Sequence, residues 1–172
     1  MNMRAFGSIL LLGLALGSGG CAGYRLGSTD GFASGDRTIV VVPFKNQTLE
    51  PRLNDDCTFA LRKEIQRDGT LRLTTDSSAS LEVSGSIVRY ERFEISFLST
   101  DTTTARDYRI NLAAHVVARD KSSGKVVLDR EVTGHSLMRV GSDLPSAERQ
   151  TIPLVATDLA RQITALLVDG TW

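Results

Sequence analysis

The chain has 172 residues, of which 41% are hydrophobic and 23% are charged, and its formal net charge is zero. This composition is typical of one globular domain and argues against a disordered chain. Because the charge is balanced, no overall basic field indicates a nucleic-acid partner, and no strong acidity indicates a basic one.

The first apolar segment runs from Ala5 to Leu16 and follows the positive charge of Arg4. It is shorter than the roughly 20 residues that a membrane-spanning helix needs. The small residues "GSGG" at 17–20 supply a cleavage site, so the whole stretch is typical of an export signal. We therefore predict a cleaved lipoprotein signal peptide over residues 1–20 rather than a membrane span.

The stretch "GGC" at 19–21 resembles the lipobox of bacterial lipoproteins, which are cut before a cysteine that then carries acyl chains. Several acyl chains give a durable anchor, because each buried CH₂ contributes about 0.8 kcal/mol. Cys21 is accordingly the predicted lipidation site, and Ala22, where an Asp would favour the inner membrane, indicates the outer membrane. Ser18 departs from the pattern, since a Leu is usual there. Two alternatives stay open: an ordinary cleavage site with a free cysteine, and a disulfide to Cys57.

Residues 21–36 are rich in Gly, Ser and Asp and predict a lipidated tether that leads to a single domain over 37–172. The β-branched run "TIVVVPF" at 38–44 predicts a central strand that weakens at Pro43, which has no N–H to donate. Residues 51–68 predict an amphipathic helix that begins with a proline in its first turn and ends before a glycine.

Alternation of apolar and polar residues predicts a strand at 79–93, in which Gly85 is a candidate for a β-bulge. A polar stretch at 99–104 separates it from a long antiparallel hairpin over 105–136. The last element is a helix over 144–168, where Pro153 is expected either to kink the helix or to begin its main part.

These elements predict an α/β (α+β) fold in the order β–α–β–β–β–α. The economical arrangement is a two-layer sandwich, in which two helices cover one face of a four-stranded mixed sheet. The strand after the first helix is expected to pair parallel with the first strand through a right-handed crossover.

The sequence offers few candidates for catalytic residues. His115 and His135 lie on opposite arms of the hairpin, where they are candidates for cross-strand neighbours, but a third metal ligand at suitable spacing is missing. Cys57 falls in the apolar stripe of the first helix and is expected to be a small buried side chain. Asp55 and Asp56 are expected to be charges at a helix start. No nucleophile motif or phosphate loop occurs, so we predict a protein that is not an enzyme, with no cofactor and no metal.

Three segments together carry a resemblance to a known family. They are "CAGYRLG" at the predicted mature start, "IVVVPFKNQTLEPRLNDDCTFALRKEIQRDGTLRL" through the first strand and helix, and "SGKVVLDREVTG" in the hairpin. In this order they resemble the LptE family of lipopolysaccharide-assembly lipoproteins. The resemblance spans nearly the whole predicted mature chain, and it implies a two-layer α/β sandwich.

The resemblance also implies a function. Members are outer-membrane lipoproteins that face the periplasm, are held in the inner leaflet of that membrane by their N-terminal lipid, plug the LptD β-barrel, help it to fold and assist lipopolysaccharide transport. Some members bind lipopolysaccharide through basic residues near strand ends and loops. The nearest candidates in this chain lie beside the two strand connections: Arg92, Arg106, Lys121 and Lys125.

Two other classes of protein remain as alternatives. The stretch "VVVPFKN" also resembles the opening of other periplasmic α/β lipoproteins, which serve as secretion-pore subunits or as activators of cell-wall synthases. A hydrolase is the third class, but it requires a convergent polar pocket with a nucleophile and a base, which the sequence does not indicate.

Overall fold

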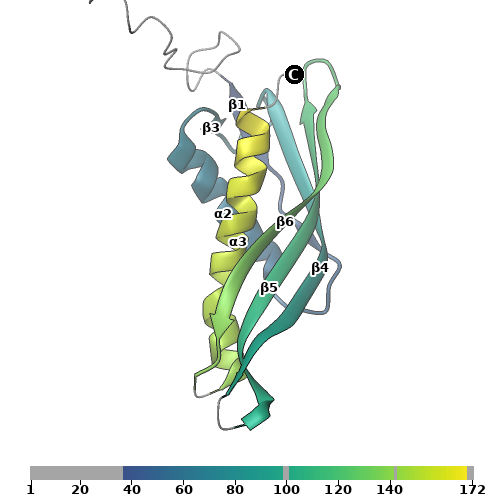
Figure 1. Cartoon of the computed structure of the whole chain (residues 1–172). Coiled ribbons are helices and arrows are strands. Elements are labelled where there is room, and N and C mark those ends of the chain that lie inside the picture. Colours follow the sequence, from purple (N-terminus) through teal and green to yellow (C-terminus); the bar gives the residue numbers. More distant parts are fainter. Residues whose placement is uncertain (1–36, 99–100, 142, 170–172) are drawn as a thin grey trace, which may run out of the picture.

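The computed structural model describes residues 37–98, 101–141 and 143–169 (Figure 1). Six strands and two helices occur in this part of the chain. In chain order they are β1 (Thr38–Val41), β2 (Lys45–Asn46), α2 (Leu53–Asp68), β3 (Arg72–Leu73), β4 (Leu81–Leu98), β5 (Asp101–Asp120), β6 (Val126–Arg139) and α3 (Leu144–Val168).

All six strands belong to one mixed sheet. Its order is β3-β1-β4-β5-β6, and β2 pairs with β4 beyond the end of β1. β1 runs parallel to β3 and β4, and β2 runs parallel to β4, whereas β4, β5 and β6 are antiparallel. The predicted parallel pairing of the first strand with a strand after the first helix is confirmed, with Ile39 beside Leu81.

The predicted count of four strands and the predicted element order are wrong. The run at 38–44 forms only β1, which ends at Val41 because Pro43 has no N–H for the ladder. The chain resumes pairing with β4 beyond this run, at Lys45, as the separate strand β2. The second missed strand, β3, has only two residues, which is too short for an alternating pattern to reveal.

The first predicted helix forms as α2 with its expected apolar stripe, which consists of Leu53, Cys57, Ala60, Leu61 and Ile65. The predicted stripe of α2, from Leu53 to Ile65, is buried throughout, and Gly69 caps the helix in the left-handed conformation with φ 75°. The helix starts later than predicted, with Arg52 at the N-cap and Pro51 outside. α3 has the predicted bounds and continues through Pro153, and the side chain of Asp143 caps its start by accepting the Ser146 N–H at 2.8 Å.

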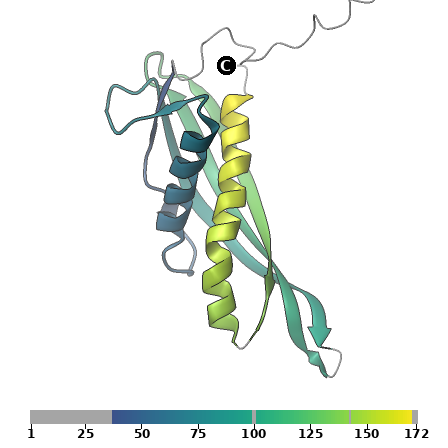
Figure 2. The same ribbon diagram turned by 90° about the vertical axis from the view of Figure 1, so that its left-hand side faces the viewer.

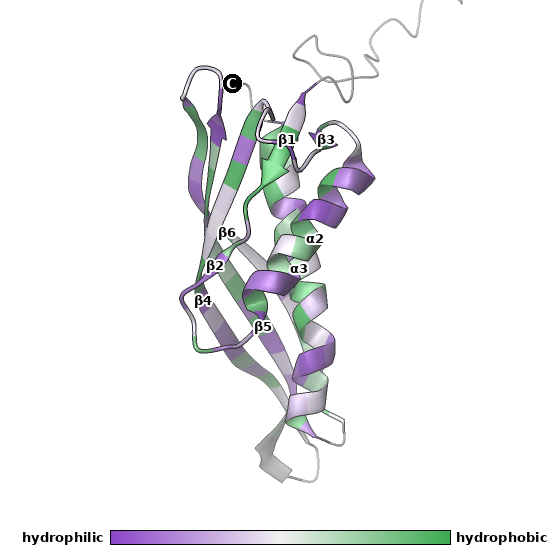
Figure 3. Ribbon diagram, turned by 180° about the vertical axis from the view of Figure 1, so that it is seen from behind, coloured by the Kyte–Doolittle hydropathy of each residue, from purple (hydrophilic) through white to green (hydrophobic). Residues whose placement is uncertain are grey.

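Both helices cover the same face of the sheet and lie side by side (Figure 2). Hydrophilic and apolar residues alternate along the elements in Figure 3, as expected when one face of each element packs inward. The core between the two layers combines the apolar stripes of the helices with the inward side chains of the strands. Its largest fully buried members include Ile39, Leu61, Leu112 and Leu159.

Gly85 of β4 was a candidate for a β-bulge, but the β4–β5 pairing is regular at this residue. The irregularities in the β4–β5 pairing lie elsewhere, between Ile87 and Arg89 and again at three steps between Glu94 and Leu98. A Cβ on Gly85 would overlap the ring of Phe44, which is 3% exposed. The glycine therefore allows the aromatic ring to lie directly on the sheet backbone.

One helix in the described part of the chain, α3, is long and apolar enough to cross a membrane by length and composition alone. Half of its most apolar window is buried against the rest of the domain. Its apolar character is therefore explained by the core that it helps to form.

Candidate functional site

The β4–β5 hairpin reaches past the first turn of α3 and forms a tip that the helices do not cover (Figures 1 and 2). Four large apolar side chains near this end are about half exposed or more, and we call them the apolar patch: Phe93 (47%), Ile95 (50%), Phe97 (46%) and Leu137 (67%). Exposed apolar side chains that gather in one region of a surface indicate an interaction site.

Arg109 lies in the middle of this patch. On β5 it is directly opposite Phe93 of β4 and Leu137 of β6, so the three side chains share the sheet face that carries no helix. Its side chain is exposed, and its guanidinium forms no ion pair with any residue that the structure describes. Arg109 was not among the four predicted basic residues, although strand alternation puts its side chain on the other sheet face from the neighbouring, buried Ile110.

The four predicted basic residues do not come together. Arg92 and Arg106 lie toward the hairpin tip, whereas Lys121 and Lys125 flank the β5–β6 turn at the other end of β5. The two pairs are about 35–50 Å apart along the strand, because Arg92 lies opposite Ile110 and an antiparallel strand rises about 3.4 Å per residue. No single ligand headgroup can touch both pairs.

Arg92 is already engaged inside the protein. Its guanidinium lies 3.1 Å from the Glu148 carboxylate of α3, and the Tyr90 hydroxyl donates to the same carboxylate at 2.6 Å. Burial and this hydrogen bond raise the pKa of Tyr90. The three side chains therefore join β4 to α3, and Arg92 is less available to a ligand than Arg106, whose side chain is exposed.

The lysines at the other end also differ. Lys121 donates to the Ser77 carbonyl at 2.6 Å and lies 3.8 Å from Glu82, so it ties the turn to the body of the domain. Lys125 is exposed, and its backbone completes the turn by accepting the Asp120 N–H at 2.9 Å. Asp120 also accepts from two serines of this turn, which lowers its pKa to about 2.

The two histidines were candidates for cross-strand neighbours, but they do not lie opposite one another. His115 is opposite Glu131 and forms a 2.8 Å pair with Asp129, whereas His135 is opposite Asn111. The described residues contain no group of three His, Cys, Asp or Glu side chains that could hold a metal ion. Neither ring is hydrogen-bonded to a hydroxyl in the described part, so the arrangement does not form a nucleophile–base pair there.

Cys57 is buried, as predicted for a residue in the apolar stripe of α2, and it is free. Burial, assisted by the charge of Asp56, raises the pKa of its thiol from the usual 9.0 to about 12. The thiol is therefore a packing group and a poor nucleophile. Cys21, the predicted lipidation site, lies outside the described residues.

A sequence model of the LptE family, described as lipopolysaccharide-assembly, matches residues 37–167. The chain belongs to the LptE family. This match covers the six described strands and nearly all of α3, so the membership rests on almost all of the residues that the structure describes. The resemblance predicted from the three sequence segments is confirmed.

Solved structures support the fold of this LptE-family chain. A protein of Xanthomonas campestris is 9% identical, with a TM-score of 0.60 and coverage of 84% of this chain and 90% of its own. A protein of Chlamydia trachomatis is 11% identical, with a TM-score of 0.57 and coverage of 78% of this chain and 96% of its own. The minor lipoprotein of Acinetobacter baumannii is 17% identical, with a TM-score of 0.50 and coverage of 77% of this chain and 92% of its own. At these identities the likeness concerns the fold alone. A comparison with curated protein sequences finds no match.

Proposed function

We propose that this LptE-family protein is an outer-membrane lipoprotein, anchored through Cys21 and facing the periplasm. In this role it plugs an LptD-type β-barrel, helps the barrel to assemble and assists lipopolysaccharide transport to the cell surface. The family match supports the general role in lipopolysaccharide assembly. The structural observation that carries the proposal is the uncovered hairpin tip with its apolar patch and Arg109.

The tip has the chemistry that an anionic amphiphile requires. Lipopolysaccharide combines phosphates with acyl chains, and guanidinium groups pair strongly with phosphate. Arg109 lies between two exposed apolar side chains, Phe93 and Leu137, and the exposed Arg106 is close by on the same strand. A phosphate at Arg109 would therefore bring acyl chains onto the apolar patch.

The rest of the helix-free sheet face is mostly polar, with Val126 as an exposed exception, and supports contact with a water-filled barrel lumen. Ion pairs cross it at Arg89–Glu131 (2.5 Å), His115–Asp129 (2.8 Å) and Arg139–Asp107 (2.7 Å). The interiors of transmembrane barrels are polar, so a polar sheet face can contact the wall of such an interior through polar groups on both sides. Exposed pairs of this kind add little stability, which leaves them free to exchange partners.

A crosslinked pull-down from outer membranes tests the proposal. The full chain, carrying an affinity tag, is crosslinked in cells, purified and analysed by mass spectrometry. Recovery of a very large β-barrel together with lipopolysaccharide is the expected result. Recovery of a ring of identical subunits, or of a cell-wall synthase without any barrel, would overturn it.

A further inference from the structure

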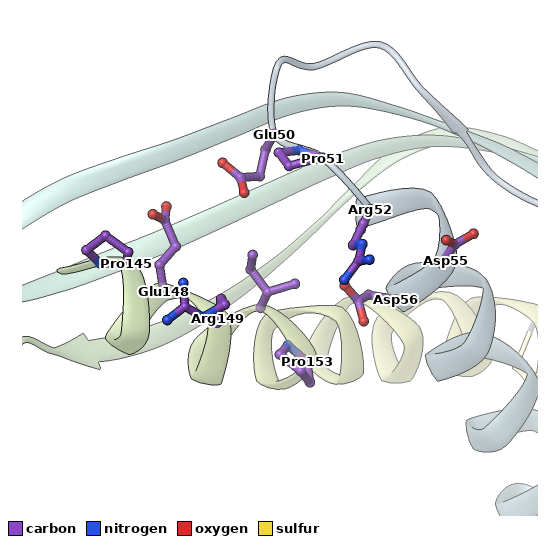
Figure 4. Close-up of a pocket in the computed structure, with 10 residues that line it drawn as sticks. Glu50, Pro51, Arg52, Asp55, Asp56, Pro145, Glu148, Arg149 and Pro153 are labelled. Carbon is purple, nitrogen blue, oxygen red and sulfur yellow. The ribbon is translucent and has the colours of Figure 1, made fainter. Parts of the chain in front are cut away.

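A concave site lies away from the hairpin tip, between the start of α2 and the start of α3. It has a volume of about 780 Å³ and is bounded by the β2–α2 loop, the first turn of α2 and the first three turns of α3 (Figure 4). Its apolar surface comes from three prolines and one isoleucine: Pro51, Pro145, Pro153 and Ile152. We call this site the inter-helix groove.

Two carboxylates face one another across the inter-helix groove, from Glu50 on the loop and Glu148 on α3 (Figure 4). The charge of Glu148 is satisfied, because Tyr90 and Arg92 both donate to its carboxylate. Glu50 differs, since its carboxylate forms no hydrogen bond or ion pair with the described residues while its backbone is held by Asn46 and Thr48.

The environment of Glu50 is unfavourable for an unpaired charge. Partial burial and the nearby charge of Glu148 raise its pKa, and Arg92 opposes this only in part. The groove as a whole is lined by four carboxylates and two guanidiniums, so it carries a net negative charge. One of the guanidiniums, that of Arg149, donates to Ser146 at 3.0 Å. A cation beside Glu50 would relieve the repulsion between the two glutamates.

We infer that the inter-helix groove docks an extended segment of a partner protein through one arginine or lysine side chain. The aliphatic stem of that side chain would lie on the prolines and Ile152, and its charged end would pair with Glu50. Long basic side chains combine an apolar stem with a cationic head, which matches a groove with apolar walls and one unpaired carboxylate. Charge complementarity thus selects this occupant over an acidic or wholly apolar segment.

The inference is tested by NMR titration of the full chain in detergent with the capped tripeptide Gly-Arg-Gly. Saturable amide shifts are expected at the β2–α2 loop and at the starts of α2 and α3, decreasing as salt is added. The capped peptide in which citrulline replaces arginine has the same shape without the charge. Its affinity should be about tenfold lower or worse, as for loss of a charge-assisted hydrogen bond.

Two variants and one matched control complete the experiment. Glu50→Gln should weaken binding of the arginine peptide by about tenfold, and Glu50→Lys, which supplies its own ammonium group, should abolish it. Glu82→Gln removes a partly exposed carboxylate on the helix-free sheet face and should leave binding unchanged. Equal binding to Glu50→Gln and the unmodified chain, or shifts scattered over the surface, would overturn the inference. So would Mg²⁺ producing the same shifts at lower concentration than the peptide.

Discussion

A Cβ atom on Gly134 of β6 would overlap the backbone nitrogen of Leu159 in α3. The helix therefore touches the strand backbone to backbone, at a position where both residues are buried. Glycine is required here by space, because any side chain would push the helix away from the sheet. This contact sets how closely the two layers of the domain approach.

The first prediction follows from that contact. Gly134→Ala should lower the free energy of unfolding by about 2–3 kcal/mol, because the neighbouring atoms belong to a helix backbone and cannot rotate aside. Urea unfolding followed by circular dichroism measures the change. Gly141→Ala is the matched control, since nothing lies within 4 Å of its Cβ position. An equal effect of the two substitutions would contradict the close approach.

The second prediction concerns Thr58, a buried hydroxyl on α2. It accepts the Phe44 N–H at 2.9 Å and donates to the Asn54 carbonyl at 2.6 Å. Thr58→Val keeps the shape but leaves a buried N–H unpaired, so it should cost about 1–3 kcal/mol of unfolding free energy. Thr157→Val removes a similar hydroxyl from an exposed site and should change little. The idea fails if thermal unfolding shows the same loss for both.

The third prediction uses the buried thiol of Cys57 in a chain that carries Cys21→Ala. Because the folded pKa is raised from 9.0 to about 12, the thiol should react with Ellman's reagent at pH 8 only after denaturant is added. The neutral thiol favours the folded state, so this contribution to stability is fully present below about pH 9. It is lost as the pH rises toward 12. Rapid reaction in the native protein would show that the site opens.

The fourth prediction separates the two groups of basic residues. Arg106→Ser combined with Arg109→Ser should weaken lipopolysaccharide binding by about tenfold or more, with a stronger effect at low salt. Lys121→Ser combined with Lys125→Ser is the matched control of equal charge change, and it should bind normally. Arg92→Ser should act chiefly on stability, because its partner is Glu148.

A pull-down with purified lipopolysaccharide at two salt concentrations measures these variants. Weaker binding in the lysine variant, with normal binding in the arginine variant, would move the site to the β5–β6 turn. Unchanged binding in all of these variants would show that the substituted basic residues do not contribute to lipopolysaccharide binding.

The fifth prediction addresses Cys21. Cys21→Ala should release the protein from purified membranes without changing its unfolding transition, because the core described for this domain begins after residue 36 and does not include Cys21. Fractionation should be done in cells that lack the barrel partner, since a bound barrel would retain the variant. Retention in those cells would count against a lipid anchor, and a parallel Cys57→Ala variant should remain in the membrane.

The local elements followed from sequence periodicity. The bounds of α3 and the buried stripe of α2 were both predicted, and the structure confirms them. The helix repeat of 3.6 residues and the strand repeat of two are backbone properties, so each segment carries its own pattern. The break at Pro43 was also predicted as a weakness, but pairing on both sides of the break depends on β4 and was missed.

The sequence by itself therefore determined the class of fold, the family and which face of each long element is buried. Only the tertiary structure decided that Arg92 pairs with Glu148, that Arg109 lies between Phe93 and Leu137, and that Lys121 is remote from Arg106. The reason is physical. Periodicity acts over neighbouring residues, whereas strand register and the approach of α3 to the sheet depend on contacts between residues that are distant in the chain.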